Sequence, residues 1–173
     1  RRETEVGKVL STLFSSGYWT SYDISILLNL DATIPNSYDA TASVWYDSSY
    51  LANDGLVTNA QFQNISGVDS FYFDGNTNGP GAGSVVSLGS IIPDNSNYTI
   101  MAWVYITSSL SGAVGIIDKD FDSGGSNYGG WGFWAGPITG GNGLWFWAQG
   151  GKDLKDTTVL SINTWYHVAI VWN

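Results

Sequence analysis

The sequence has no cysteine and few basic residues, and both shortages exclude classes of function. Without Cys, the chain has no disulfide, no thiolate metal site and no cysteine nucleophile. Six Lys and Arg stand against fifteen Asp and Glu, which gives a formal net charge of −9. Binding to phosphates requires a basic patch, yet Arg1, Arg2 and Lys8 all lie at the N-terminus. We therefore expect no nucleic-acid partner.

Glutamate and histidine are almost as scarce, and this bears on catalysis. The only glutamates are Glu3 and Glu5, and the only histidine is His167. Glycoside hydrolysis needs two positioned carboxylates, and a Ser-His-Asp triad needs a histidine beside its nucleophile. Asp118 and Asp120 share a predicted strand face, but that strand leads into a Ser/Gly loop. We expect no catalytic residue, and we expect His167 to be a buried histidine with one satisfied hydrogen bond.

Long apolar runs are also missing. No stretch approaches the roughly 18 apolar residues that suggest a membrane span, so we expect none. The chain begins without Met and ends inside the apolar pattern of Val171-Trp172-Asn173. We expect it to be part of a longer protein that is incomplete at its C-terminus.

Aromatic residues and glycine are abundant and point to strands and turns. The chain has 173 residues with nine Trp, ten Tyr, seven Phe and 22 Gly. Alternating or apolar runs bounded by turn residues predict about ten strands and an all-β, antiparallel two-sheet sandwich over residues 22–173. Residues 1–21 are predicted to form an N-terminal arm, helical or extended. The strands are predicted at 23–31, 44–47, 56–62, 70–74, 84–88, 98–106, 115–119, in the two arms of 129–148, and at 158–161 and 165–172.

An aromatic hairpin at Gly129–Ala148 is the best candidate for a binding platform. Because side chains alternate along a strand, Trp131 and Phe133 share one face of its first arm and Trp134 the other. In the second arm, Trp145 and Trp147 oppose Phe146. The Asn142-Gly143 pair is predicted to belong to the hairpin connection.

Two interpretations of the hairpin remain open. In the first, aromatic rings stack on sugars and amide side chains bind their hydroxyl groups. In the second, the rings fill the space between the sheets. We expect Trp131, Phe133 and Phe146 in the core and at least one other Trp near the surface. The candidate carbohydrate-binding residues are Tyr128, Trp134, Asn142, Trp145, Trp147 and Gln149, with Asn127 as a further amide.

Acidic residues cluster in the loop that precedes the hairpin. Asp118, Asp120 and Asp122 are spaced to offer hard oxygen ligands, so Ca²⁺ is the cofactor that the loop would suit. The alternative is a solvated acidic loop without metal. A second oxygen-rich stretch runs from Asp47 to Asp54, and there Asp and Asn are expected to close turns through the backbone.

Several short motifs, in their order along the chain, resemble one known family. They are Trp45-Tyr-Asp-Ser-Ser49, Asn53-Asp-Gly55, Phe71-Tyr-Phe-Asp-Gly75, Tyr98-Thr-Ile-Met-Ala-Trp-Val104 and Thr164-Trp-Tyr-His-Val-Ala169. Over about residues 24–173 the chain resembles the laminin-G-like, concanavalin A-like lectin/glucanase jelly-roll superfamily. The resemblance implies a jelly roll that in many members binds Ca²⁺ at its rim. The Glu-x-Asp-x-x-Glu motif of its glucanases is absent, so we expect a recognition domain and not an enzyme.

The opening stretch, with Leu30-Asp-Ala32 and Trp45-Tyr-Asp-Ser-Ser49, most resembles copies in structural proteins of tailed bacteriophages. This resemblance implies a fibre or other virion-surface protein, exposed outside the cell, that binds host glycan. It also implies a homo-oligomer joined to other virion or surface subunits through residues 1–21. The alternatives are a decoration or assembly module that contacts only virion proteins, a bacterial cell-surface adhesin domain, and a degraded glucanase.

Overall fold

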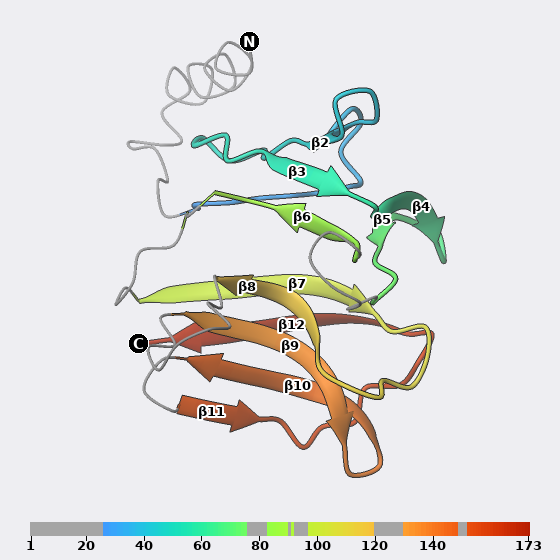
Figure 1. Ribbon diagram of the computed structural model, residues 1–173, viewed down its shortest axis with the longest axis vertical. Coiled ribbons are helices and arrows are strands. Elements are labelled where there is room, and N and C mark those ends of the chain that lie inside the picture. Colours follow the sequence, from blue (N-terminus) through green and yellow to red (C-terminus); the bar gives the residue numbers. More distant parts are fainter. Residues whose placement is uncertain (1–25, 76–82, 90, 92–96, 120–129, 149–151) are drawn as a thin grey trace, which may run out of the picture. The chain divides into compact units, whose positions relative to one another are not determined.

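The computed structural model describes residues 26–75, 83–89, 91, 97–119, 130–148 and 152–173. Within these ranges every regular element is a β-strand, and all strand pairs are antiparallel (Figure 1). The predicted all-β class is thereby confirmed. The chain divides into two compact units, Arg1–Ile91 and Ile92–Asn173. The predicted arm at residues 1–21 and its boundary lie outside the described residues.

The first unit contains a four-stranded sheet and a separate hairpin. The sheet has the order β1-β2-β3-β6, with β1 at Tyr38–Asp39, β2 at Val44–Trp45, β3 at Gly55–Thr58 and β6 at Val85–Ser87. The hairpin pairs β4, Gln61–Ile65, with β5, Val68–Tyr72. Its two-residue turn is Ser66-Gly67, with φ of 52° and 86°. Positive φ at both central residues matches the right-handed twist of the strands, which is why this turn closes the hairpin tightly.

Aromatic packing forms the core of the first unit. Phe71 on β5 is buried with Ala32 and Val57. Its ring lies 4.5 Å from the Trp45 ring and 4.9 Å, edge-on, from the Tyr38 ring, measured between centroids. These contacts fix the hairpin against the loop and strands of the same unit.

A buried carboxylate organises the loop between β2 and β3. Asp47 is 1% exposed and accepts hydrogen bonds on both oxygens. Oδ1 accepts from the backbone N–H of Asn29 at 2.7 Å and of Ser49 at 2.8 Å. Oδ2 accepts from Ser49 Oγ at 2.6 Å and from the backbone N–H of Asn53 at 2.8 Å. The expectation that Asp residues close turns here is confirmed.

The same carboxylate explains a wrong prediction. The described part of the predicted strand 23–31, residues 26–31, is not in a strand. Asp47 takes the N–H of Asn29, and the Asn53 side chain donates to the carbonyl of Leu27 at 2.7 Å. The carbonyl of Asn29 also accepts from the backbone N–H of Ser48 at 2.9 Å. These partners occupy backbone groups that a neighbouring strand would otherwise use.

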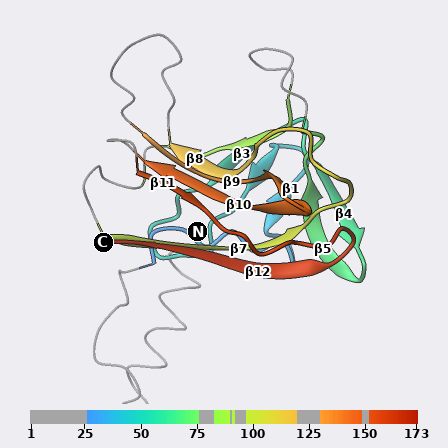
Figure 2. The same cartoon turned by 90° about the horizontal axis from the view of Figure 1, so that it is seen from below.

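The second unit is a two-layer sandwich. One layer pairs β7, Tyr98–Tyr105, with β12, Trp165–Trp172, along their full lengths. The other has the order β11-β10-β9-β8, and Figure 2 shows it stacked over the β7–β12 layer. Its strands are β8 at Val114–Lys119, β9 at Trp131–Ile138, β10 at Gly141–Ala148 and β11 at Lys152–Lys155.

Inward side chains of both layers form the core of this sandwich. Phe133 and Phe146 are each 2% exposed and pack with Trp131 of the same sheet and with Ile100 and Val168 of the other layer. The prediction that Trp131, Phe133 and Phe146 are core residues is confirmed. At 25 cal/mol per Å², burial of each such ring contributes about 2–3 kcal/mol of transfer free energy.

Two strand predictions in this region were wrong. Residues 158–161 form no strand, because they make only a single β-bridge, between Leu160 and Asn142. The fourth strand of the sheet is instead β11, four residues with too little alternation to be recognised. In the first unit, the predicted strand 56–62 divides into β3 and β4 at Asn59, whose φ of 55° interrupts the extended backbone.

Candidate functional site

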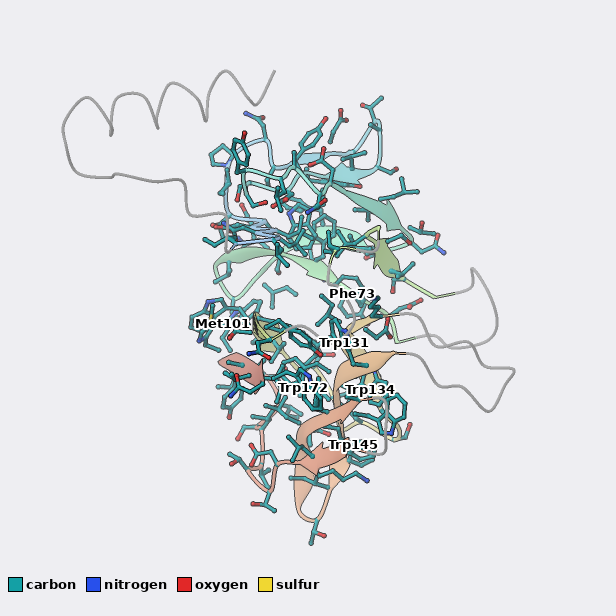
Figure 3. All side chains as sticks on the ribbon, turned by 90° about the vertical axis from the view of Figure 1, so that its left-hand side faces the viewer. Phe73, Met101, Trp131, Trp134, Trp145 and Trp172 are labelled. Carbon is teal, nitrogen blue, oxygen red and sulfur yellow. The ribbon has the colours of Figure 1, made fainter. Side chains whose placement is uncertain are left out.

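Three half-buried tryptophans lie on the outer face of the four-stranded sheet. Trp134 on β9 is paired directly with Trp145 on β10, and Trp147 is paired with Gly132. Side chains alternate along a strand, so these rings point away from Phe133 and Phe146. In Figure 3, Trp134 and Trp145 project on the side of the ribbon opposite to Trp131 and Trp172. We call Trp134, Trp145 and Trp147 the tryptophan face.

Glycines beneath Trp134 and Trp145 let these two rings lie against the backbone. A Cβ atom added to Gly132 would overlap the Trp134 ring. A Cβ added to Gly136 would lie 3.1 Å from Cε2 of Trp145, which is closer than such atoms normally approach. The rings therefore lie over positions without side chains. A ring that lies on the sheet keeps its opposite face directed outward.

A carboxylate borders the Trp134 ring. A Cβ atom added to Gly115 on β8 would lie 3.3 Å from Asp118 Oδ2 and 3.6 Å from Trp134 Cδ1. The β-bulge between Gly115 and Ile117 shifts the register, so that Asp118 falls opposite Gly132 and on the same face as Trp134. The structure thus brings one predicted metal-binding residue to the predicted aromatic platform.

An open hollow of about 550 Å³ adjoins Trp145. Lys155 on β11 places its Nζ 4.2 Å from the centroid of the Trp145 ring, which is cation–π geometry. Asp156 accepts hydrogen bonds from the N–H and the hydroxyl of Thr158, both at 3.1 Å. Hydroxyl groups of Thr139 and Thr157 also line the hollow. The hollow combines the Trp145 ring, the Lys155 ammonium group, the Asp156 carboxylate and two threonine side chains.

Asn142, a predicted sugar-binding residue, has a different environment. It is 3% exposed, and its Oδ1 accepts from the N–H of Leu110 at 2.9 Å while Nδ2 donates to the carbonyl of Ser108 at 3.5 Å. The side chain therefore fixes the loop after β7. Its placement offers no exposed amide to a ligand, and we leave it out of the site proposed below.

The predicted turn at Asn142-Gly143 is wrong. The turn consists of Thr139 and Gly140, because Ile138 pairs with Gly141, and Gly140 supplies a φ of 95°. A turn at Asn142-Gly143 would place Phe133 opposite Lys152. The observed register instead sets Phe133 directly opposite Phe146, so that the two rings are neighbours across the strands.

Five predicted site residues lie outside the described residues, namely Asn127, Tyr128, Gln149, Asp120 and Asp122. In the described ranges no group of three or more His, Cys, Asp or Glu side chains is placed to hold a metal ion. Asp118 is described, but its two predicted partners are not. The calcium site therefore stays a prediction.

The single histidine is not buried, contrary to expectation. His167 is exposed on the outer face of the β7–β12 layer, where its ring lies 5.1 Å from that of Trp103. The apolar run around it suggested a core position. Strand alternation instead directs Tyr166 and Val168 inward and His167 outward. Its described ring contact is with Trp103, which is not a nucleophile.

The sequence reasoning missed Lys155 and the glycines under the rings. Lys155 belongs to β11, the strand that was not predicted, and only the pairing of Trp145 with Lys155 places it over the ring. A signal for the glycines was present. Gly132 and Gly136 flank Trp134 at a spacing of two, so all three share one strand face.

The strands of the second unit and the tryptophan face define a class of protein, namely an antiparallel β-sandwich with an aromatic outer surface. A comparison with protein-family models then matched residues 78–173 to the concanavalin A-like lectin/glucanases superfamily. The chain belongs to this superfamily. Comparisons with curated proteins and with solved structures returned no match. No described helix is long and apolar enough to cross a membrane.

Proposed function

We propose that the chain is a non-catalytic carbohydrate-recognition module whose glycan site is the tryptophan face. The observation that carries this proposal is the Trp134 ring, which lies over Gly132 with the Asp118 carboxylate at its edge. A pyranose has an apolar C–H face that packs on an aromatic ring and hydroxyl groups that donate to a carboxylate. Trp134 would stack on the sugar, and Asp118 would accept from its hydroxyls.

Neighbouring groups extend the same surface. Trp145 and Trp147 provide further aromatic area, and Thr139 and Thr157 provide hydroxyl partners beside Trp145. An extended oligosaccharide would contact several of these groups in turn. The shallow form of the hollow favours low affinity per site, which becomes useful when many copies act together by effective concentration.

The scarcity of glutamate favours a binding role over catalysis. The chain has no glutamate beyond Glu5. A retaining or inverting glycosidase needs a second carboxyl group about 5–10 Å from the first, across the scissile bond. Asp118 borders Trp134, and in this role its carboxylate would accept from a hydroxyl group without cleaving the sugar.

The biological setting that we propose is the surface of a phage particle. Its support is the resemblance of the stretch Leu30–Ser49 to domains of tailed-phage structural proteins. In that setting the module is extracellular, binds host glycan, and is joined to other virion subunits in a homo-oligomer. The net charge of −9 disfavours a nucleic-acid partner.

A second candidate function is assembly with another protein. Trp103 and Met101 are 67% and 63% exposed on the outer face of the β7–β12 layer, and Val171 is also exposed there. Large apolar side chains gathered on one face are typical of protein contacts. This surface is distinct from the tryptophan face, so the two candidates can be tested separately.

The deciding experiment is a glycan array probed with the multimerised chain in Ca²⁺ and in EDTA, followed by calorimetry on the hits. We expect Trp134→Ala to weaken binding at least tenfold. The control Trp103→Ala removes an equally large ring from the other sheet and should leave binding unchanged. Absence of any glycan hit, or loss of binding in the Trp103 variant alone, would refute the proposed site.

A further inference from the structure

The first unit contains a second hollow, of about 440 Å³. The loop Ala32–Tyr38 forms one wall, and Phe62 of β4 and Asp69 of β5 form the other. This size is within the range of small-molecule sites. The hollow shares no residue with the tryptophan face.

Aromatic and apolar side chains line part of this hollow, beside the polar side chains of Thr33, Asn36 and Ser37. The Phe62 ring is 43% exposed and stacks on Tyr38, with ring centroids 5.6 Å apart and an interplanar angle of 24°. The inner side of this pair rests on the buried Phe71, whose ring is 5.4 Å from Phe62. Phe62 is therefore held in place by two rings while part of it remains open. Ile34 and Pro35 complete the apolar lining.

One carboxylate faces these rings. Asp69 and Phe62 lie on the same face of the hairpin, because Asp69 pairs with Asn64 and Phe62 with Phe71. Asp69 Oδ1 accepts from Asn64 Nδ2 at 2.8 Å. Its Oδ2 accepts no hydrogen bond from the described residues.

The charged residues of this part of the sequence are all acidic. Residues 26–91 contain six Asp and no Lys, Arg or His. Within this stretch Asp69 thus has no cationic side chain to pair with. An exposed carboxylate next to an open aromatic ring attracts a cation that also carries apolar substituents, because the ring quadrupole adds to the Coulomb attraction.

We propose that this hollow binds an organic ammonium group. Asp69 would neutralise the positive charge, Phe62 would contact the carbon atoms next to the nitrogen, and Ile34 and Pro35 would cover the rest. An anion is disfavoured by the six carboxylates of this stretch. Nothing in this inference depends on the tryptophan face, so it stands or falls separately from the proposed glycan function.

The first test compares a cation with its neutral isostere on the unaltered chain. Choline and 3,3-dimethylbutan-1-ol have the same shape and differ in charge. In ¹H–¹⁵N NMR titrations we expect choline to shift the signals of residues 32–38, 62 and 69 and to bind at least tenfold more tightly. Added NaCl should weaken it. Equal binding of the two compounds, or shifts elsewhere only, would overturn the proposal.

Further ligands distinguish the source of the ammonium group. Glucosamine represents an amino sugar, and Nα-acetyl-lysine amide represents a protein side chain. The ligand that binds most tightly identifies the source. If none of the three cations binds, the proposal is wrong.

Variants then assign the roles. Asp69→Asn keeps an acceptor for Asn64 and should reduce choline binding about tenfold, and Phe62→Leu should reduce it several-fold. Asp74→Asn is the matched control, because it removes one charge from the same unit while keeping an acceptor for Ser84. Equal loss in the Asp69 and Asp74 variants would show a non-specific charge effect and overturn the site. Unchanged melting temperatures check that the variants fold.

Discussion

Replacing Asp47 should unfold the loop that joins β2 to β3. In Asp47→Ala, the N–H groups of Asn29, Ser49 and Asn53 lose their acceptor, and these backbone donors cannot turn away. The Ser49 hydroxyl can rotate to another partner. Each orphaned donor costs about 1–1.5 kcal/mol, so the free energy of unfolding should fall by about 3–5 kcal/mol. That is a large part of the 5–15 kcal/mol typical of a domain.

Acid should remove the same contribution. Burial alone would raise the pKa of the Asp47 carboxyl, but hydrogen bonds from Ser49, Asn29 and Asn53 outweigh it and hold the pKa below its ordinary value. The Asp47 carboxyl therefore takes up its proton at a lower pH in the folded state than in the unfolded state. The stabilisation is complete above a pH of about 4 and disappears as the pH falls through the folded pKa.

Urea unfolding followed by tryptophan fluorescence measures both effects. The control is Asp39→Ala, because Asp39 accepts from the N–H groups of Thr41 and Ala42 but lies in an exposed turn. We expect that control to lose no more than about 1 kcal/mol. Asp47→Asn should fall between the two and show a flatter acid response. If Asp47→Ala costs no more than Asp39→Ala, or if acid destabilises the variant as much as it does the unaltered chain, the reasoning is wrong.

Substitutions at three further positions test the sandwich and its outer face. Gly132→Ala should displace the Trp134 ring, lower the unfolding free energy by about 1–3 kcal/mol and weaken any glycan bound there, as measured by urea unfolding and calorimetry; unchanged values would contradict the close approach of ring and backbone. Phe133→Ala should cost about 3–5 kcal/mol in urea unfolding, and a loss below about 1 kcal/mol would place Phe133 outside the core. Asn142→Ala should cost about 1–3 kcal/mol and speed hydrogen exchange of the Leu110 amide, whereas Asn142→Asp keeps the acceptor and should protect that amide.

Period-two alternation made the facing of the aromatic hairpin predictable. It put Phe133 and Trp134 on opposite faces, and likewise Phe146 and Trp145, without knowledge of the pairing, because the side-chain period of a strand is fixed by its backbone. Which of the tryptophans lie at the surface stayed open. The same rule, applied to His167, would have placed it outward beside Trp165. The wrong expectation came from the apolar residues around His167, without regard to the alternation of side chains along the strand.

Features that depend on contacts across the chain were not predictable in this way. The segment 26–31 looks like a buried strand, and only the distant Asp47 and Asn53 show why it joins no sheet. Both Asn142-Gly143 and Thr139-Gly140 are plausible turns, and the choice depends on pairing across the whole hairpin. Lys155 became part of the site through the register of a strand too short to recognise.

The glycines under the tryptophan face carry information that an inventory of side chains omits. Gly132 and Gly136 are buried beneath the rings, so an alanine scan restricted to residues that contact a ligand would pass over them. Yet each position limits how its neighbouring ring can lie. In other sequences of this fold, a Gly-x-Trp-x-Gly strand opposite a Trp-x-Trp strand would therefore be a better search pattern for such a surface than the tryptophans alone, and loss of either glycine would signal that the surface had been reshaped.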